Sequence, residues 1–247
     1  MSAMPAAAQR YALYLAPAKP WWQTGSRWLG RDAATGAPMP RSANDDPRLE
    51  AWTEAPRLYG LHATLKPPLR LRDGASPADI DAAARALARR HAPFTATLRL
   101  RRLRGFLAWV LDEADAAAGG PMRRLADDAM SALDGLRAAP TPQERARRLA
   151  GPLSPTQRAM LDRWGYPYAM DTYTFHISLT GSLDQADLAR AEALLATHCA
   201  RLPARPMPVQ AVSLYVQPGP GEPFLAARHY GFDGSAADAA GAAWLAP

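Results

Sequence analysis

The sequence repeats one short stretch: HATL at residues 62–65 returns as HISL at residues 176–179. Both copies lie among residues that favour β-strands. Alternate residues of a strand face the same side, so in each copy the histidine and the hydroxyl residue two positions later share one face. The repeat therefore predicts two strands that each bury an apolar side and present an imidazole and a hydroxyl on the other.

The same order of elements follows each copy. The first copy ends a strand predicted over 58–65, closed by the Lys-Pro-Pro of 66–68 and followed by a helix over 77–91 and strands over 94–102 and 106–111. The second copy lies in a strand predicted over 171–180, followed by a helix over 185–200 and strands over 209–216 and 223–230. The order of strands and helices repeats only after a long stretch of sequence, which indicates a duplication rather than a solenoid.

The remaining segments frame these two halves. A strand is predicted over 10–16, an irregular stretch over 17–56 with a short helix over 21–29, and helices over 121–164. Ser76, Thr141 and Ser154 each precede a proline at the first helical position, which is a strong helix-start signal. The residues from 234 onward are small, and we expect them to fray.

These patterns predict an α/β (α+β) protein that forms a single domain over 1–247. We expect a first lobe over about 10–112, a helical connector over about 113–165 and a second lobe over about 166–233. Duplicated strands in two lobes would bring two imidazoles and two hydroxyls together across one cleft.

The composition narrows the class of protein. The chain has 247 residues, 48% hydrophobic and 21% charged, which is typical of a soluble globular protein. The single cysteine excludes a disulfide framework and a cysteine-based zinc cluster. We find no apolar run long enough to span a membrane and no signal-peptide core in residues 1–10, so we expect a cytoplasmic protein. The net charge of +6 favours anionic partners, but most of the basic residues are arginines in an Ala- and Pro-rich chain, so the arginine count alone says little.

The paired imidazoles and hydroxyls suit phosphodiester cleavage. One neutral histidine can act as general base, while the other, protonated, acts as general acid toward the leaving oxygen. The hydroxyls of Thr64 and Ser178 can donate to the non-bridging phosphate oxygens. His62, Thr64, His176 and Ser178 are therefore the predicted catalytic set, with no metal and no cofactor.

Other chemistries lack their signatures. The HExxH zinc motif, the GxSxG nucleophile elbow, the Walker A loop and the GxGxxG fingerprint are all absent from the sequence. One histidine followed by a hydroxyl at this spacing would arise easily by chance, whereas two copies in matching contexts are much more specific. His91, His198 and His229 lack that context and are interpreted as structural.

The paired motifs resemble those of the two-histidine (2H) phosphoesterase superfamily, which includes RNA 2′,3′-cyclic phosphodiesterases and 2′-5′ RNA ligase-like proteins. The resemblance extends over most of the chain and is closest to a bacterial branch named after phosphonate metabolism. It is carried by RYALYLAP (10–17), WLGRDAATG (28–36), YGLHATLKPPLRL (59–71), WGYPYAMDTYTFHISLTG (164–181) and VSLYVQPGPGEPF (212–224). It implies concave antiparallel sheets around a cleft that holds both motifs.

Further residues are candidates for substrate binding. Lys66 continues the alternation of His62 and Thr64, and the family motif favours a phosphate contact for it. Thr180 holds the matching place in the second half. Tyrosines just before the second motif can stack on a base or sugar, and other candidates lie in family-like stretches. The substrate-binding set is Lys66, Thr180, Tyr168, Tyr173, Tyr14 and Arg31.

We expect a monomeric, metal-independent phosphodiesterase that acts on a small cyclic phosphate or a related nucleotide or ribosyl phosphate ester. The association with phosphonate degradation suggests a phosphoribosyl cyclic phosphate. An RNA substrate, with 2′,3′-cyclic ends or 2′-5′ linkages, is one alternative, although no long basic and aromatic strip tracks a single strand. A non-catalytic nucleotide- or RNA-binding protein is another.

Overall fold

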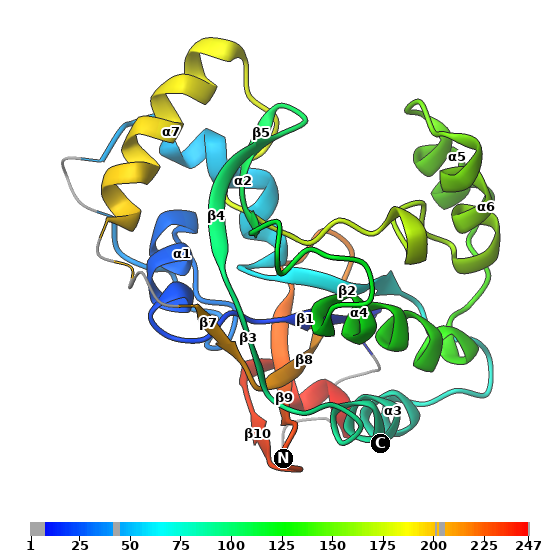
Figure 1. Cartoon of the computed structure of the whole chain (residues 1–247). Helices are drawn as coiled ribbons and strands as arrows, with labels where there is room; N and C mark the ends of the chain where they lie inside the picture. Colours follow the sequence, from blue (N-terminus) through cyan, green and yellow to red (C-terminus); the bar gives the residue numbers. More distant parts are fainter. Residues whose placement is uncertain (1–7, 42–44, 201, 203–205, 247) are drawn as a thin grey trace.

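A large antiparallel sheet organises the protein, as a computed structural model shows for residues 8–41, 45–200, 202 and 206–246 (Figure 1). Its eight strands run in the order β10-β9-β8-β1-β2-β6-β5-β4, and a separate two-stranded sheet pairs β3 with β7. The predicted α/β class with antiparallel sheets is confirmed. The strands are β1 (Arg10–Leu15), β2 (Ala63–Leu69), β3 (Phe94–Ala96), β4 (Leu98–Leu103), β5 (Phe106–Leu111), β6 (His176–Ser178), β7 (Met207–Val209), β8 (Ala211–Gln217), β9 (Leu225–Gly231) and β10 (Ala236–Asp238).

Helices cover the sheet in separate groups. The helices are α1 (Trp21–Leu29), α2 (Leu49–Tyr59), α3 (Pro77–Ala88), α4 (Pro121–Ala132), α5 (Pro142–Leu149), α6 (Pro155–Trp164) and α7 (Gln185–Cys199), with 3-10 turns η1 (Asp134–Leu136), η2 (Met170–Thr172) and η3 (Ala240–Leu245). Helices α3 and α4 pack on β8, β9 and β2, and α7 packs on β5 and α1. In the view of Figure 1, α1, α2 and α7 lie on the left and α5 and α6 on the right, with β2 between them.

Three helix starts predicted from the sequence are confirmed. The side chain of Ser76 caps α3, that of Thr141 caps α5 and that of Ser154 caps α6. Each forms a capping box with the side chain three residues later, so donors that the helix itself cannot satisfy are bonded locally.

The strands of the two halves interleave. Strand β2, which follows His62, pairs with β1 and through it with β8 and β9 of the second half. Strand β6, which carries the second motif, pairs with β5 of the first half. A single residue pair, Ala63 with Ile177, joins the two groups of strands. Each part of the sheet thus combines strands from both predicted lobes, whereas contiguous lobes over about 10–112 and 166–233 would each pair their own strands.

Several predicted boundaries are wrong. Helix α2 occupies the end of the stretch predicted to be irregular and the start of the strand predicted over 58–65, so His62 precedes β2. The helix buries one face, which consists of Leu49, Trp52, Thr53 and Pro56. This helical pattern was not recognised in the sequence because a proline lies inside it. The predicted strand over 94–102 is split between β3 and β4, and the one over 171–180 is reduced to β6. The residues after 234 form β10 and η3 instead of fraying.

Lys66 lies on the opposite face of β2 from Thr64, although the two residues are two positions apart. Thr64 pairs with Tyr14 of β1, but Lys66 pairs with Leu13, and neighbouring residues of β1 face opposite sides. The register slips between these pairs because β2 carries an extra residue there, next to two prolines that cannot donate to the ladder. The alternation used to place Lys66 beside the histidine is therefore broken, which removes the sequence argument for a phosphate contact by Lys66.

Lys66 instead anchors the connector to the sheet. Its side chain is fully buried, and Nζ donates to the Met130 carbonyl at 2.9 Å and to Asp134 Oδ1 at 2.8 Å. Burial lowers the pKa of Lys66 to about 8, although the bond to Asp134 opposes that shift. Asp134 also accepts from Arg137 and Arg163, so one carboxylate fixes three cations around η1.

We predict that Asp134→Ala lowers the free energy of unfolding by about 3 kcal/mol, because it leaves the buried Lys66 ammonium without its counter-ion. Lys66→Met should cost much less, since Asp134 keeps two arginine partners. Urea unfolding of both variants measures the difference. Equal losses in the two variants would contradict this account of the pair.

Candidate active site

The two repeated motifs meet at one pocket near the middle of the sheet. The pocket has a volume of about 220 Å³, and its wall includes His62 from the first motif and Ser178 from the second. The residues around it are Ala55, Pro56, Tyr59, Gly60, His62, Phe106, Ser178, Thr180, Gly181 and Ser182. The structure thus brings two segments more than a hundred residues apart to one site.

The pairing of Ala63 with Ile177 arranges the motif residues in a square. Because the strands are antiparallel, His62 lies opposite Ser178 and Thr64 lies opposite His176 when the register continues on either side of that pair. Ala63 and Ile177 are fully buried, so all four polar residues point to the other face. The two histidines occupy one diagonal of the square, where strand residues lie about 7–8 Å apart.

His62 is held rigidly by its neighbours. Its Nδ1 lies 2.8 Å from the carbonyl oxygen of Gly60, and its ring stacks on Tyr14 with the centroids 3.8 Å apart. Gly60 has a φ of 76°, and a Cβ at this position would lie 2.5 Å from the Cβ of Ala33. Only glycine fits here, because the turn that presents the carbonyl needs both the positive φ and the space.

His176 is held in the same way. Its Nδ1 lies 2.9 Å from the carbonyl oxygen of Thr174, two residues earlier, as in the first motif. Phe106 of β5 meets its ring edge-on with the centroids 5.8 Å apart. A carbonyl oxygen can only accept, so in both histidines Nδ1 donates and Nε2 is left to face the site.

Burial keeps both imidazoles uncharged at neutral pH. It lowers the pKa of His62 to about 4, with a smaller contribution from the nearby His176, and the bond to Gly60 opposes the shift. Burial also lowers the pKa of His176, and the positive charge of Arg104 adds to this. Both Nε2 atoms are therefore proton acceptors in the free protein.

The hydroxyl residues differ in the hydrogen bonds that they already form. Thr64 Oγ1 lies 3.3 Å from Nε2 of His62 and donates to it when that imidazole is neutral. Ser178 lines the pocket. Thr180 also reaches the pocket wall; its oxygen accepts a bond of 3.0 Å from the backbone N–H of Leu107, and its hydroxyl hydrogen can still donate.

Two other predicted residues have structural partners. Tyr14 is fully buried beneath His62 and supports that ring rather than facing the pocket. Arg31 is buried and donates to the carbonyl oxygens of Phe224 at 2.6 Å and Arg57 at 3.3 Å, so it ties the loop after α1 to the start of β9 and the end of α2.

The two tyrosines before the second motif also lie outside the pocket wall. Tyr168 lies beneath the guanidinium of Arg104 at 4.9 Å from its ring centroid. Burial raises the pKa of the Tyr173 hydroxyl well above its usual value, and this hydroxyl has no hydrogen-bond partner among the described residues.

Three further residues at the site were not predicted from the sequence. Tyr59 ends α2, and its ring lies 6.2 Å from that of His62. Phe106 begins β5 against His176. Arg104 sits in the β4–β5 turn with a φ of 49° and influences the charge of His176. A turn of Arg-Gly type was visible between the two strands, but its proximity to the second motif depends on the β5–β6 pairing.

Two helices outside the sheet form hydrogen bonds to the chain at the end of the second motif. Pro56 has no N–H, so the carbonyl of Trp52 is free within α2 and accepts from the backbone N–H of Gly181 at 2.7 Å. Trp28 of α1 donates its indole N–H to the carbonyl of Leu179 at 2.8 Å. Two helices therefore fix the chain just after His176 and Ser178.

The other histidines are engaged elsewhere, and no metal cluster is found. His198 bonds the carbonyl of Thr24, His229 bonds Ser213, and His91 lies 3.2 Å from a carboxylate oxygen of Asp128. Within the described part of the chain, no three His, Cys, Asp or Glu side chains gather as metal ligands would, and no helix has the length and apolar character to cross a membrane.

Comparison with solved structures finds distant likenesses. Escherichia coli LigT in apo form is 15% identical, with a TM-score of 0.40, and the match covers 92% of this chain and 98% of that one. Kluyveromyces marxianus Usb1 is 12% identical, with a TM-score of 0.34, over 90% of this chain and 99% of that one. A structure described as a phosphoesterase is 12% identical, with a TM-score of 0.38, over 91% and 98%.

Curated relatives are closer in sequence. A protein named ribose 1,5-bisphosphate phosphokinase PhnN from Laribacter hongkongensis is 40% identical over 225 residues, which is 89% of this chain and 51% of the relative. A protein of the same name from Janthinobacterium sp. is 36% identical over 235 residues, or 91% and 51%. The chain thus spans about half the length of these relatives.

A protein family matches the greater part of the chain. The match runs over residues 64–225, from the first motif to the start of β9, and includes the whole second motif. The chain therefore belongs to the family described as "Protein of unknown function (DUF1045)".

Proposed function

We propose that this protein is a metal-independent phosphodiesterase that hydrolyses a small cyclic phosphate by paired-histidine acid–base catalysis. The observation that supports this most directly is the square of two imidazoles and two hydroxyls on one face of the sheet. Both imidazoles turn Nε2 toward the site because a backbone carbonyl occupies each Nδ1. Two such groups on a diagonal can act on opposite sides of one phosphorus atom.

The reaction needs one proton removed from water and one donated to the leaving ester oxygen. A neutral histidine removes a proton from water as the water oxygen bonds to phosphorus. The second, protonated histidine gives its proton to the ester oxygen as the bond from that oxygen to phosphorus breaks. The hydroxyls of Thr64 and Ser178 donate to the non-bridging oxygens, where negative charge grows in the transition state.

Substrate binding favours uptake of the missing proton from solvent. Both pKa values are depressed in the free protein, so neither imidazole is charged at neutral pH. A phosphate anion within hydrogen-bond reach favours the charged form and raises the pKa of the imidazole beside it. An anion in the pocket thus increases the fraction of the acid that is charged.

The dimensions of the pocket favour a small substrate. Its volume of about 220 Å³ is below the roughly 300–1,000 Å³ of pockets that enclose drug-sized ligands. The curated relatives bear the name of an enzyme for ribose 1,5-bisphosphate, which is a small sugar phosphate. This chain has no Walker A loop, so from that name we adopt the sugar-phosphate substrate class and not the phosphokinase reaction. Phosphonate catabolism is a consistent setting for such a substrate.

RNA ends and non-catalytic binding are the competing functions. A 2′,3′-cyclic RNA end would present the same phosphodiester to the square, and the basic net charge favours RNA. A protein that only binds nucleotides would not need two imidazoles with matched tautomers.

We expect the wild-type protein to hydrolyse at least one member of a panel of small cyclic phosphates in the presence of EDTA. His62→Ala and His176→Ala should each lower kcat by about 10²–10⁴-fold, because each removes one proton-transfer step. His91→Ala is the matched control, since that imidazole lies outside the pocket. Activity that survives both site substitutions would refute the mechanism.

Oligonucleotides in the same panel separate the alternatives. Faster turnover of cyclic-ended RNA than of the small esters would favour the RNA function. Tight, strongly salt-dependent RNA binding with no turnover of any ester would favour the binding function.

Titration of the histidine resonances by NMR checks the charge states. In the free protein we expect a pKa of about 4 for His62 and a value below the usual range for His176. Saturating inorganic phosphate should raise at least one of them by about one unit or more. Bound phosphate that leaves both values unchanged would show that the anion does not sit between the imidazoles.

A further inference from the structure

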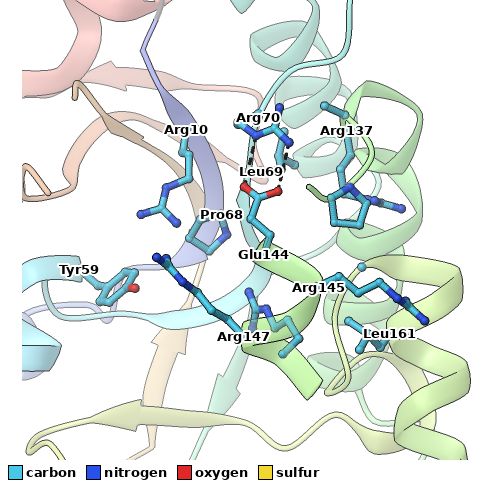
Figure 2. Close-up of a pocket in the computed structure, with 14 residues that line it drawn as sticks. Arg10, Tyr59, Pro68, Leu69, Arg70, Arg137, Glu144, Arg145, Arg147 and Leu161 are labelled. Carbon is cyan, nitrogen blue, oxygen red and sulfur yellow. Dashed lines mark hydrogen bonds and ion pairs between the residues drawn. The ribbon is translucent and has the colours of Figure 1, made fainter. Parts of the chain in front are cut away.

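A second, larger pocket lies beside the first and is lined by arginines (Figure 2). It has a volume of about 350 Å³ and lies between β1, the end of β2 and helices α5 and α6. We call it the arginine pocket. Its wall contains one carboxylate, Glu144, and six arginines: Arg10, Arg70, Arg137, Arg145, Arg147 and Arg148.

Three of these arginines are already neutralised. Arg70 forms a two-pronged pair with Glu144 at 3.1 and 3.3 Å, which holds α5 against the sheet. Arg145 pairs with Asp162 at 2.7 Å. Arg137 shares Asp134 with Lys66. These three positive charges serve to attach the connector.

The other three have no carboxylate partner among the described residues. Arg10 donates to the side-chain oxygen of Gln217 at 2.6 Å and lies over the ring of Phe224. Arg148 lies over a tyrosine ring at 5.0 Å. Arg147 is exposed and has neither a hydrogen-bond nor an ion-pair partner among the residues that the structure describes. Figure 2 shows Arg10 and Arg147 reaching toward the same space from β1 and α5, with Tyr59 beside them.

The arginine pocket continues from the catalytic pocket. Tyr59 lines both. Its ring lies 6.2 Å from that of His62 on one side and stacks on Phe224 at 5.2 Å on the other, and the Arg10 guanidinium is 5.5 Å from Phe224. Arg10 also shares a face of β1 with Tyr14, the residue beneath His62. One extended small molecule can therefore contact both pockets.

We propose that the arginine pocket binds a second phosphate group of the substrate, so that the substrate is a small molecule with a cyclic phosphate at one end and a phosphomonoester at the other. This rests on the proposed hydrolysis at the histidine pair. Guanidinium groups bind phosphate through paired, charge-assisted hydrogen bonds. Three positive charges without counter-ions around one cavity match a phosphate dianion, whereas the catalytic pocket offers no arginine in its wall.

The test uses two substrates that differ in one group: ribose 1,2-cyclic phosphate and the same compound with a 5-phosphate. We expect the wild-type KM to be at least tenfold lower for the phosphorylated compound. Arg147→Ala should raise that KM about tenfold, leave its kcat nearly unchanged and leave the unphosphorylated compound unaffected. Arg10→Gln should do the same, and thermal unfolding confirms that each variant is folded.

Arg101→Ala is the matched control, because it removes the same charge from the exposed surface of β4, outside both pockets. If Arg147→Ala behaves like this control, or changes both substrates equally, the proposal is overturned. It is also overturned if the arginine variants lose affinity for cyclic-ended oligonucleotides while the 5-phosphate gives no advantage.

A binding measurement separates this proposal from the proposed function. If neither these compounds nor any other member of the panel is hydrolysed, the hydrolysis proposal fails, and calorimetry with inorganic pyrophosphate still tests the arginine pocket. We expect pyrophosphate to bind wild type and His62→Ala alike and to bind an Arg10→Gln/Arg147→Ala double variant at least tenfold more weakly. Equal binding by the double variant would refute the pocket itself.

Discussion

The pairing of Ala63 with Ile177 is the contact on which the candidate site depends. It is the one residue pair between β2 and β6, and it sets both the distance and the alignment of the two motifs. A slip of one residue would turn each histidine from the open face into the core. One residue pair is a weak ladder, so the alignment needs support from elsewhere. That support comes from the indole of Trp28 and the free carbonyl of Trp52, which bond the chain just after β6.

The sequence was sufficient to predict that the two motifs meet at one site, but not to place every other residue around it. Alternation in a strand predicted that His62 and Thr64 share a face, and Thr64 Oγ1 does lie 3.3 Å from Nε2 of His62. The same rule failed two residues later at Lys66, where a bulge beside two prolines reverses the faces. Helix α2 was missed because Pro56 interrupts a helical pattern that its buried face otherwise shows. In both cases, a proline altered a periodicity that local patterns assume to be constant.

Long-range strand pairing explains the remaining differences between the sequence predictions and the structure. Phe106 and Arg104 reach the second motif only because β5 of the first half pairs with β6 of the second, and no local pattern encodes which strand pairs with which. The arginines illustrate the same point. Composition treats them as equivalent, whereas the fold separates those that hold the connector, such as Arg70, from those that face an open cavity without a counter-ion, such as Arg147.

The pairing of strands from both halves of the sequence also affects how the chain folds. Strand β1 pairs with β2 along one edge, but along its other edge it pairs with β8, whose residues follow about 200 positions later in the chain. Contacts so distant in sequence require large loops to close before they stabilise anything, which slows folding. Because each part of the sheet needs strands from both halves, neither half can mature alone during synthesis on the ribosome. The exposed edges of β1 and β2 must then remain unpaired in the nascent chain, where they are open to aggregation until the second half arrives.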